Sequence, residues 1–254
     1  MKQKRFTFLL LFVANLFCAS AQKWYTPEID QKVEDLLKQM TVEEKLGYIG
    51  GVNWMYTKSI DRLGIHRMKM SDGPQGLGTD GKSTAYPSTV TLAATWNENL
   101  AYQYGKALGR DCRARNVNVI LGPAVNIYRA PMCGRNFEYM GEDPYLTSRI
   151  CVGYIKGVQD QGVMATVKHF VANNSDYDRN NISNDIDERT LNEIYFPAYK
   201  AAIQEAEVGA VMTSYNLMNG IYTTENPWLL KEVLRNQWGF KGLVMSDWGS
   251  THYC

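Results

Sequence analysis

The stretch VMATVKHF, residues 163–170, carries the clearest structural signal in the sequence, because an apolar, β-branched run ends abruptly in a lysine and a histidine. Similar short runs recur along the chain, and each is followed by a polar loop and then by an amphipathic stretch. The runs are almost continuously apolar rather than alternating, which is typical of parallel strands covered on both faces. Such strands are predicted at residues 67–70, 117–121, 163–167, 209–213 and 243–245.

Amphipathic stretches between these runs predict helices, because their apolar residues recur at i, i+3 and i+4. The predicted helices cover residues 97–115, 146–161, 188–207 and 227–238. Two shorter helices are expected before the first strand, since Thr26 precedes Pro27 at one helix start and Thr41 with Glu44 forms a capping-box pattern at the next. Alternating strands and helices predict an α/β fold, either a doubly wound sheet or a (β/α)₈ barrel.

Charged or aromatic side chains that could act in catalysis or binding follow every predicted strand at its C-terminal end. They are Asp72, Arg135, Lys168, His169, Tyr215, Asp247 and Trp248. In a (β/α)₈ barrel the strand ends converge on one face, whereas an open sheet concentrates its site at one switch point. The sequence therefore favours a TIM-type (β/α)₈ barrel.

The composition argues against partners that are bound through bulk charge. Lys and Arg number 27 against 26 Asp and Glu, a net charge of +1, so no basic excess is available for nucleic acid or a membrane surface. The histidines, His66, His169 and His252, lie far apart in the sequence, and neither a CxxC pair nor a GxSxG elbow occurs. We expect a small neutral partner, no cofactor, no metal, and no nucleotide or dinucleotide site.

The N-terminus has the organisation of a secretory signal peptide. Basic residues precede an apolar run over residues 6–17, which closes on the small triplet 19–21. Cleavage is expected after Ala21, so that residues 1–21 are the signal peptide and the protein is secreted or periplasmic. A membrane anchor and a lipoprotein attached through Cys18 are the alternatives. In an oxidising compartment the other cysteines are expected to form at most one disulfide bridge.

Asp247 is the strongest candidate for a catalytic residue. It follows the apolar run GLVM, residues 242–245, and precedes Trp248. A carboxylate at a strand end is costly unless it faces a polar cleft, and beside an aromatic face it suits a glycosidase nucleophile that attacks an anomeric carbon. The alternative is an aspartate that caps the following helix.

The cationic residues at strand ends suit recognition of sugar hydroxyls, and each has a structural alternative. Lys168 and His169 place two donors side by side, although a lone histidine is more often a buried structural residue. Arg135 could clamp substrate oxygens, or it could pair with Glu138 or Glu142 to hold its own loop.

Asp72 lies in the sequence SDGP, residues 71–74. Its carboxylate could accept hydrogen bonds from vicinal sugar hydroxyls, but Asp-Gly-Pro is also ordinary turn chemistry. A content of 16 Tyr and 6 Trp supplies flat aromatic faces with polar edges, which gives weak support to carbohydrate binding.

Together these motifs resemble glycoside hydrolase family 3. They are SDGP at residues 71–74, GP at 122–123 with NI at 126–127, GRNFE at 134–138 with GEDP at 141–144, KHF at 168–170 and SDW at 246–248. They run in order from about Thr26 to His252, and the pattern is most similar to the β-glucosidase branch. The N-acetylhexosaminidase branch is disfavoured, because its Asp-His dyad would fall in residues 171–187, where no histidine occurs.

The resemblance implies a retaining exo-glycosidase that releases terminal β-linked glucose from an oligosaccharide or β-glucoside. It implies Asp247 as the nucleophile and a sugar site made of Asp72, Arg135, Lys168, His169 and Tyr215, with Trp248 beside it. By the same resemblance we expect residues 22–254 to form an N-terminal barrel domain, incomplete at its C-terminus. The acid/base would then come from a C-terminal α/β sandwich domain that is absent from this chain. The alternatives are a β-xylosidase of the same family and a non-catalytic sugar-binding fragment.

Overall fold

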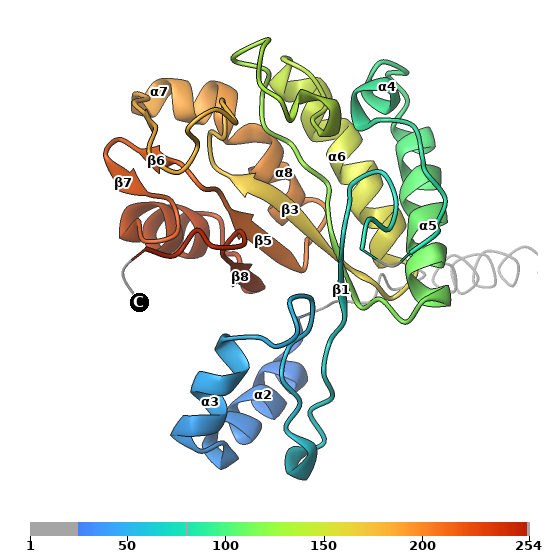
Figure 1. The fold of residues 1–254 in the computed structure, drawn as a ribbon, viewed down its shortest axis with the longest axis vertical. Coiled ribbons are helices and arrows are strands. Elements are labelled where there is room, and N and C mark those ends of the chain that lie inside the picture. Colours follow the sequence, from blue (N-terminus) through green and yellow to red (C-terminus); the bar gives the residue numbers. More distant parts are fainter. Residues whose placement is uncertain (1–24, 80, 253–254) are drawn as a thin grey trace, which may run out of the picture.

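The computed structural model describes residues 25–79 and 81–252 (Figure 1). The predicted signal peptide, Cys18 and Cys254 lie outside these residues. The main body consists of a parallel sheet with helices packed on it, and two N-terminal helices lie below this body in the view of Figure 1.

The main sheet contains five parallel strands in the order β1-β2-β3-β5-β8. They are β1 Met70–Asp72, β2 Val119–Leu121, β3 Met164–Phe170, β5 Ala210–Thr213 and β8 Leu243–Met245. In this sheet each strand pairs in parallel with the one that follows it in the chain order of the sheet, as in a TIM-like α/β fold. This arrangement confirms the predicted fold class. Among the described residues, β1 and β8 are the two edges of this sheet.

The first strand lies later than predicted. Residues 67–69 were expected to belong to it, but Lys69 instead forms an antiparallel bridge with Tyr56. The segment before β1 therefore pairs with a hairpin from the N-terminal region, and the parallel ladder with β2 begins only at Met70. Apolar composition alone does not distinguish these two kinds of pairing.

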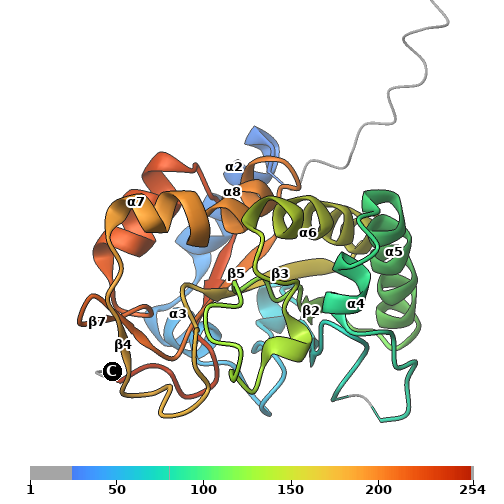
Figure 2. The same ribbon diagram turned by 90° about the horizontal axis from the view of Figure 1, so that it is seen from above.

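Helices α5 (Glu98–Ala114), α6 (Pro144–Gln159) and α8 (Pro197–Gln204) lie together on one face of the sheet (Figure 2). The predicted helix over 188–207 comprises α7 (Glu188–Thr190), η4 (Leu191–Tyr195) and α8, and the one over 227–238 is η5 (Trp228–Gln237). Both η4 and η5 are wound with i→i+5 hydrogen bonds. The helices thus form at the predicted positions.

Glycines allow α5 and α6 to approach closely. A Cβ on Gly105 would lie 2.1 Å from the carbonyl oxygen of Tyr154, and one on Gly157 would lie 2.1 Å from that of Tyr102. Any side chain at either position would force the helices apart. The two glycines therefore set the spacing of the helical layer that supports β2 and β3.

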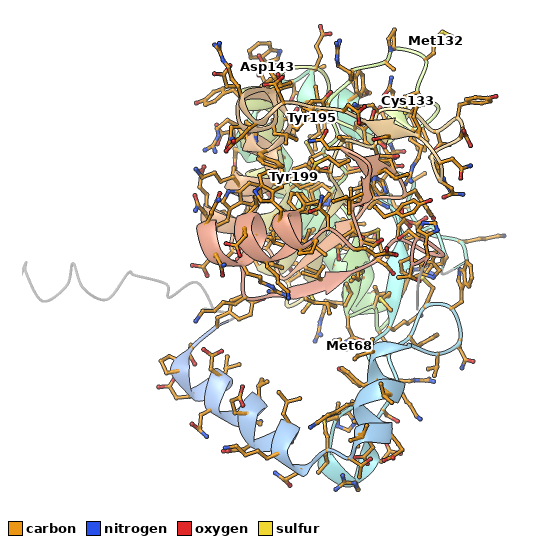
Figure 3. The ribbon with its side chains drawn as sticks, turned by 90° about the vertical axis from the view of Figure 1, so that its left-hand side faces the viewer. Met68, Met132, Cys133, Asp143, Tyr195 and Tyr199 are labelled. Carbon is orange, nitrogen blue, oxygen red and sulfur yellow. The ribbon has the colours of Figure 1, made fainter. Side chains whose placement is uncertain are left out.

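The two faces of the sheet carry different apolar clusters. Ile120 and Val167 belong to the main core, which includes the helices and the fully buried Tyr199 (Figure 3). Val119 and Leu121 point to the opposite face, as the alternation of a strand requires. There they meet partly buried methionines, namely Met68, Met70, Met164 and Met245.

A second sheet of three short strands was not predicted. It contains β4 (Ser183–Asn184), β6 (Leu217–Met218) and β7 (Ile221–Tyr222). Asn219 and Gly220 connect β6 to β7 with φ values of 51° and 80°, the left-handed conformations of a two-residue hairpin turn. This sheet joins the loop after β3 to the loop after β5.

The N-terminal helices α2 (Pro27–Gln39) and α3 (Val42–Ile49) begin as predicted. The Thr26 hydroxyl accepts a hydrogen bond from the Ile29 N–H, and Thr41 forms a complete capping box with Glu44. No residue of either helix is buried. The shorter helices are α4 (Thr89–Ala93), η2 (Asp61–Leu63) and η3 (Asn136–Glu138).

Two further predictions concern the cysteines and the membrane. Cys133 and Cys151 are buried free thiols, and the expectation of at most one bridge stays a prediction. In residues 25–79 and 81–252, none of the helices combines the length and apolar character that crossing a bilayer requires.

Candidate active site

The C-terminal ends of the strands carry the predicted site residues. Asp72 is the last residue of β1, Lys168 and His169 lie in β3, and Asp247 follows β8. The structure brings these residues together with Arg135, Tyr215 and Trp248 in one continuous set of contacts. The distances, burial and hydrogen-bond partners of these residues determine which chemistry each side chain can perform.

Lys168 holds two carboxylates together. Its ammonium Nζ lies 3.1 Å from Oδ1 of Asp72 and 3.7 Å from Oε2 of Glu138. The Lys168 side chain is only 3% exposed, so its charge would be very costly without such partners. The contact with Asp72 ties the end of β1 to β3.

Arg135 bridges the carboxylates of Glu138 and Asp247. Its Nε donates to Oε1 of Glu138, and one terminal nitrogen lies 3.8 Å from Oδ2 of Asp247. Of the two alternative partners in the sequence, Glu138 is the one used, while Glu142 is exposed. Arg135 therefore both braces its loop and faces the candidate nucleophile, so the two interpretations are not exclusive.

Glu138 is a site residue that sequence reasoning treated only as a possible loop brace. Its side chain is 5% exposed and its two oxygens face Lys168 and Arg135. The buried carboxylate thus balances the charges of both cations. The signal that could have revealed it is its place in GRNFE, three residues after Arg135 on the same helical turn.

Asp247 is held with one oxygen anchored and one free. The Trp248 N–H donates to Oδ1 at 2.8 Å, whereas Oδ2 is buried with no hydrogen-bond partner among the described residues. Burial raises the pKa of Asp247, and the Trp248 N–H, Arg135, Lys168 and the Tyr215 hydroxyl oppose this only in part. The free oxygen is available to react with a bound molecule.

Asp72 differs from Asp247 in exposure and in charge environment. Its side chain is 54% exposed, and Oδ1 accepts hydrogen bonds from the Gly73 N–H and from Lys168. The partial burial of Asp72 would by itself raise its pKa, but Lys168 and the Gly73 N–H outweigh this effect, so the pKa is lowered. Asp72 therefore stays ionised and accepts hydrogen bonds.

His169 is fully buried beside Asp247, the candidate nucleophile. Its Nε2 lies 3.6 Å from Oδ2 of Asp247. Burial, together with the nearby charges of Arg135, Lys168 and Arg179, lowers the pKa of His169 well below its ordinary value. The imidazole is therefore neutral at physiological pH.

Tyr215 and Arg179 close the site from the loops after β5 and β3. The guanidinium carbon of Arg179 lies 3.9 Å from the centre of the Tyr215 ring. Burial and the charge of Asp247 raise the pKa of Tyr215 to about 12, so its hydroxyl keeps its proton. Arg179 was missed in the sequence because it follows no apolar run, and a position in an irregular loop gives no pattern to identify it.

Trp248 is paired with a second tryptophan that was also missed. Its Nε1 donates to the carbonyl oxygen of Trp54 at 2.9 Å, and the two ring centres are 6.5 Å apart. Trp54 is 73% exposed and has a φ of 66°, which is costly for a bulky residue. A hairpin from the N-terminal region thus places an open aromatic face next to Trp248.

One sequence motif bears on the expectation that the chain has no nucleotide or dinucleotide site. Residues 76–83, GLGTDGKS, match both GxGxxG and GxxxxGK[ST]. Those motifs bind phosphate where a glycine-rich turn leads directly into a helix N-terminus. Here the following residues are irregular and the next helix starts only at Thr89. The described structure therefore lacks the context that would make this stretch a phosphate loop.

A cavity of about 540 Å³ is lined by a different set of residues from the charged cluster. Its lining includes Asn174, Asp185, Asp187 and Tyr195. None of the seven predicted site residues lines it. The charged cluster around Asp247, rather than this cavity, is therefore the candidate active site.

A buried carboxylate among cations and aromatic rings, at the C-terminal ends of parallel strands, defines the class of TIM-like glycoside hydrolase domains. Sequence comparison agrees, because the profile of the glycosyl hydrolase family 3 N-terminal domain matches residues 36–253. The chain belongs to this family, which confirms the resemblance seen in its motifs.

Curated relatives of the chain include several glycosidases. A β-glucosidase of Rhizobium radiobacter is 48% identical over 87% of this chain and 28% of its own length. An exo-α-(1→6)-L-arabinopyranosidase of Bifidobacterium breve is 40% identical over 85% of this chain and 30% of its own length. The chain thus spans about three tenths of the length of these relatives.

The solved structure of β-glucosidase 3B from Thermotoga neapolitana, in complex with glucose, superposes with a TM-score of 0.81. It is 41% identical, and the match covers 85% of this chain and 34% of that chain. Because the match covers most of this chain, the fold of the domain is that of family 3 β-glucosidases.

Proposed function

We propose that this chain provides the sugar-holding and nucleophilic part of a retaining, exo-acting β-glucosidase. The observation that carries the proposal is the free, buried Oδ2 of Asp247, which lies between Arg135 and His169. The family assignment and the relatives named β-glucosidase support glucose as the sugar. Asp72, Lys168 and the neighbouring polar groups would hold its hydroxyls.

In the proposed reaction, Oδ2 of Asp247 forms a bond with the anomeric carbon while the bond from that carbon to the leaving oxygen breaks. A proton donor protonates the leaving oxygen. Water then attacks the anomeric carbon from the other side, loses a proton to the same group and restores the Asp247 carboxylate. Two inversions leave the released glucose in its original β configuration.

The proton donor is proposed to lie in polypeptide outside this chain. The other two carboxylates of the cluster, Asp72 and Glu138, are both ion-paired with Lys168. The lowered pKa of Asp72 is the opposite of what a general acid needs. Neither residue is therefore suited to protonate a leaving oxygen.

A substrate panel with the natural gene product, purified from its source, tests the proposed function. We expect an aryl β-glucoside to be hydrolysed faster than the aryl β-xyloside or the aryl α-L-arabinopyranoside. Proton NMR should show β-glucose as the first product, because retention requires the covalent intermediate. A disaccharide, which needs protonation of its leaving group, should also be cleaved if the acid is present.

Other outcomes of the panel identify the alternatives. A clear preference for the xyloside would favour a β-xylosidase, and α-glucose as the first product would exclude a retaining mechanism. Turnover of the aryl glucoside without cleavage of disaccharides would mean that no acid operates. Glucose binding without any turnover would identify a sugar-binding domain.

The acidic limb of the pH profile should be set by Asp247. Asp247 must be ionised to attack, so activity is lost as the pH falls through its pKa, which burial raises above the ordinary 3.8. The limb of kcat/KM, which reports the free enzyme, should therefore lie above pH 3.8. Because Arg135 lowers this pKa, Arg135→Met should move the limb to still higher pH.

Arg149→Met is the matched control, since Arg149 pairs with Glu205 outside the cluster. Its acidic limb should coincide with that of the wild type. A limb that lies below the ordinary aspartate value, or that does not move in Arg135→Met, would show that another group controls the profile.

We also propose that residues 1–21 direct the protein out of the cytoplasm and are then removed. Basic residues, an apolar run and the small triplet that ends at Ala21 support this proposal. The same purified preparation decides it, because its N-terminal residue should be Gln22. An intact Met1 would contradict the proposal.

A further inference from the structure

The amide of Asn126 clamps the backbone of His169. Oδ1 of Asn126 accepts the His169 N–H at 2.9 Å, and Nδ2 donates to the His169 carbonyl oxygen at 3.0 Å. Asn126 is 2% exposed and His169 is fully buried. These two backbone partners fix which end of the amide is oxygen, because an N–H only donates and a carbonyl only accepts.

The same amide oxygen also faces the imidazole. Oδ1 of Asn126 lies 3.2 Å from Nδ1 of His169. An amide oxygen cannot donate, so a hydrogen bond at this distance requires the hydrogen to be on Nδ1. Arg135, Lys168 and Arg179 all disfavour a second proton on the ring. A neutral ring has one N–H, and Nε2 is then a bare acceptor.

The bare nitrogen faces a second unsatisfied acceptor. Nε2 of His169 and Oδ2 of Asp247 are 3.6 Å apart, and neither has a hydrogen-bond partner among the residues that the structure describes. Two buried acceptors side by side are unfavourable until a donor arrives. A hydroxyl group is the donor that a bound sugar supplies.

We propose that Asn126 is a positioning residue that keeps the imidazole proton of His169 on Nδ1, so that Nε2 accepts a hydrogen bond from a sugar hydroxyl beside Asp247. This proposal rests on the proposed sugar-binding function. It gives His169 the opposite role from the donor that the sequence suggested. Asn126 itself does not touch the sugar; it acts through His169.

The tautomer can be measured without any turnover. Histidine-selective ¹⁵N labelling of the natural gene product, followed by two-bond ¹H–¹⁵N correlation, distinguishes an Nδ1–H ring from an Nε2–H ring. The His169 signals are assigned by their loss in His169→Gln. We expect the Nδ1–H form in the wild type, and an Nε2–H form in the wild type would overturn the proposal.

Asn126→Leu removes the oxygen opposite Nδ1 and should release the proton to Nε2. Asn173→Leu is the matched control, because Asn173 is also a buried asparagine near the site but bonds to Tyr139 instead of His169. Its His169 signals should keep the wild-type form. The wild-type spectrum decides the tautomer even if Asn126→Leu does not fold.

Sugar analogues test the direction of the hydrogen bond. Inhibition constants are measured for glucose and for its deoxy and deoxyfluoro derivatives at each ring position, since fluorine cannot donate a hydrogen bond. At the hydroxyl that donates to Nε2, both the deoxy and the deoxyfluoro derivative should bind the wild type about 10-fold more weakly than glucose does. That loss should shrink in Asn126→Leu, where Nε2 no longer accepts.

The outcomes separate this proposal from the proposed function. An Nδ1–H ring in a protein that does not bind glucose would contradict the proposed function and leave only the tautomer assignment standing. Glucose binding with an Nε2–H ring would overturn the role of Asn126 alone. If no hydroxyl position loses affinity in a manner that depends on Asn126, the acceptor role of His169 is wrong.

Discussion

Asp247→Ala should lower the turnover of an aryl β-glucoside by about 10⁴-fold or more, because it removes the carboxylate that would attack the anomeric carbon. Binding should be much less affected. The hydroxyls would still meet Asp72, Lys168 and His169, and the lost side chain is only 10% exposed. Steady-state kinetics and calorimetric titration with glucose measure the two effects separately.

Azide distinguishes a missing nucleophile from a damaged site. In Asp247→Ala this small anion can enter the space of the lost carboxylate and attack the anomeric carbon as the aryl oxide leaves. The product should be the α-glucosyl azide, because only one inversion occurs. Asp61→Ala changes an exposed aspartate outside the cluster and should show normal kinetics without azide. Full activity of Asp247→Ala would remove Asp247 from the nucleophile role.

Glu138→Gln should lower the free energy of unfolding by about 3 kcal/mol, the range expected when one partner of a buried ion pair is removed. The carboxylate balances both Arg135 and Lys168, and Lys168 is only 3% exposed. Neutralising Glu138 would leave Lys168 paired with the partly exposed Asp72 and without its buried counter-charge. Denaturant unfolding of the natural gene product measures the change.

Glu142→Gln is the matched control for this prediction. It makes the same chemical change four residues further along, at an exposed carboxylate. Its unfolding free energy should stay close to that of the wild type, since surface substitutions usually change it by less than about 0.5 kcal/mol. Equal stability of the two variants would show that the Glu138 carboxylate is not needed to hold the two cations.

Strands and strand-end residues could be predicted from the sequence because burial on both faces leaves a readable apolar run. Such a run shows where a strand ends, and therefore where a polar residue such as Lys168 or Asp247 enters the site. It does not show which carboxylate a cation selects. That choice depends on distances across the sheet, and for this reason Glu138 and Glu142 could not be distinguished.

Residues that reach the site from irregular segments were missed. Trp54 and Arg179 follow no apolar run, and only the folded chain brings them to Trp248 and Tyr215. The small second sheet was missed for a different reason, because two-residue strands are too short to show alternation. Asn219 followed by Gly220 was nevertheless a hairpin signal that could have been used.

The asparagine clamp also extends the sheet by one rung. Beyond β2, the Val125 N–H still bonds to the Lys168 carbonyl oxygen at 2.8 Å, and one residue later a side chain continues the ladder. The Asn126 amide has the size and polarity of a peptide group, so it imitates a neighbouring strand at His169. Aspartate lacks the N–H, and glutamine is one methylene too long. The Asn126 side chain thus continues the hydrogen bonding of the sheet and also holds the imidazole proton of His169 on Nδ1. A substitution at position 126 would therefore change both.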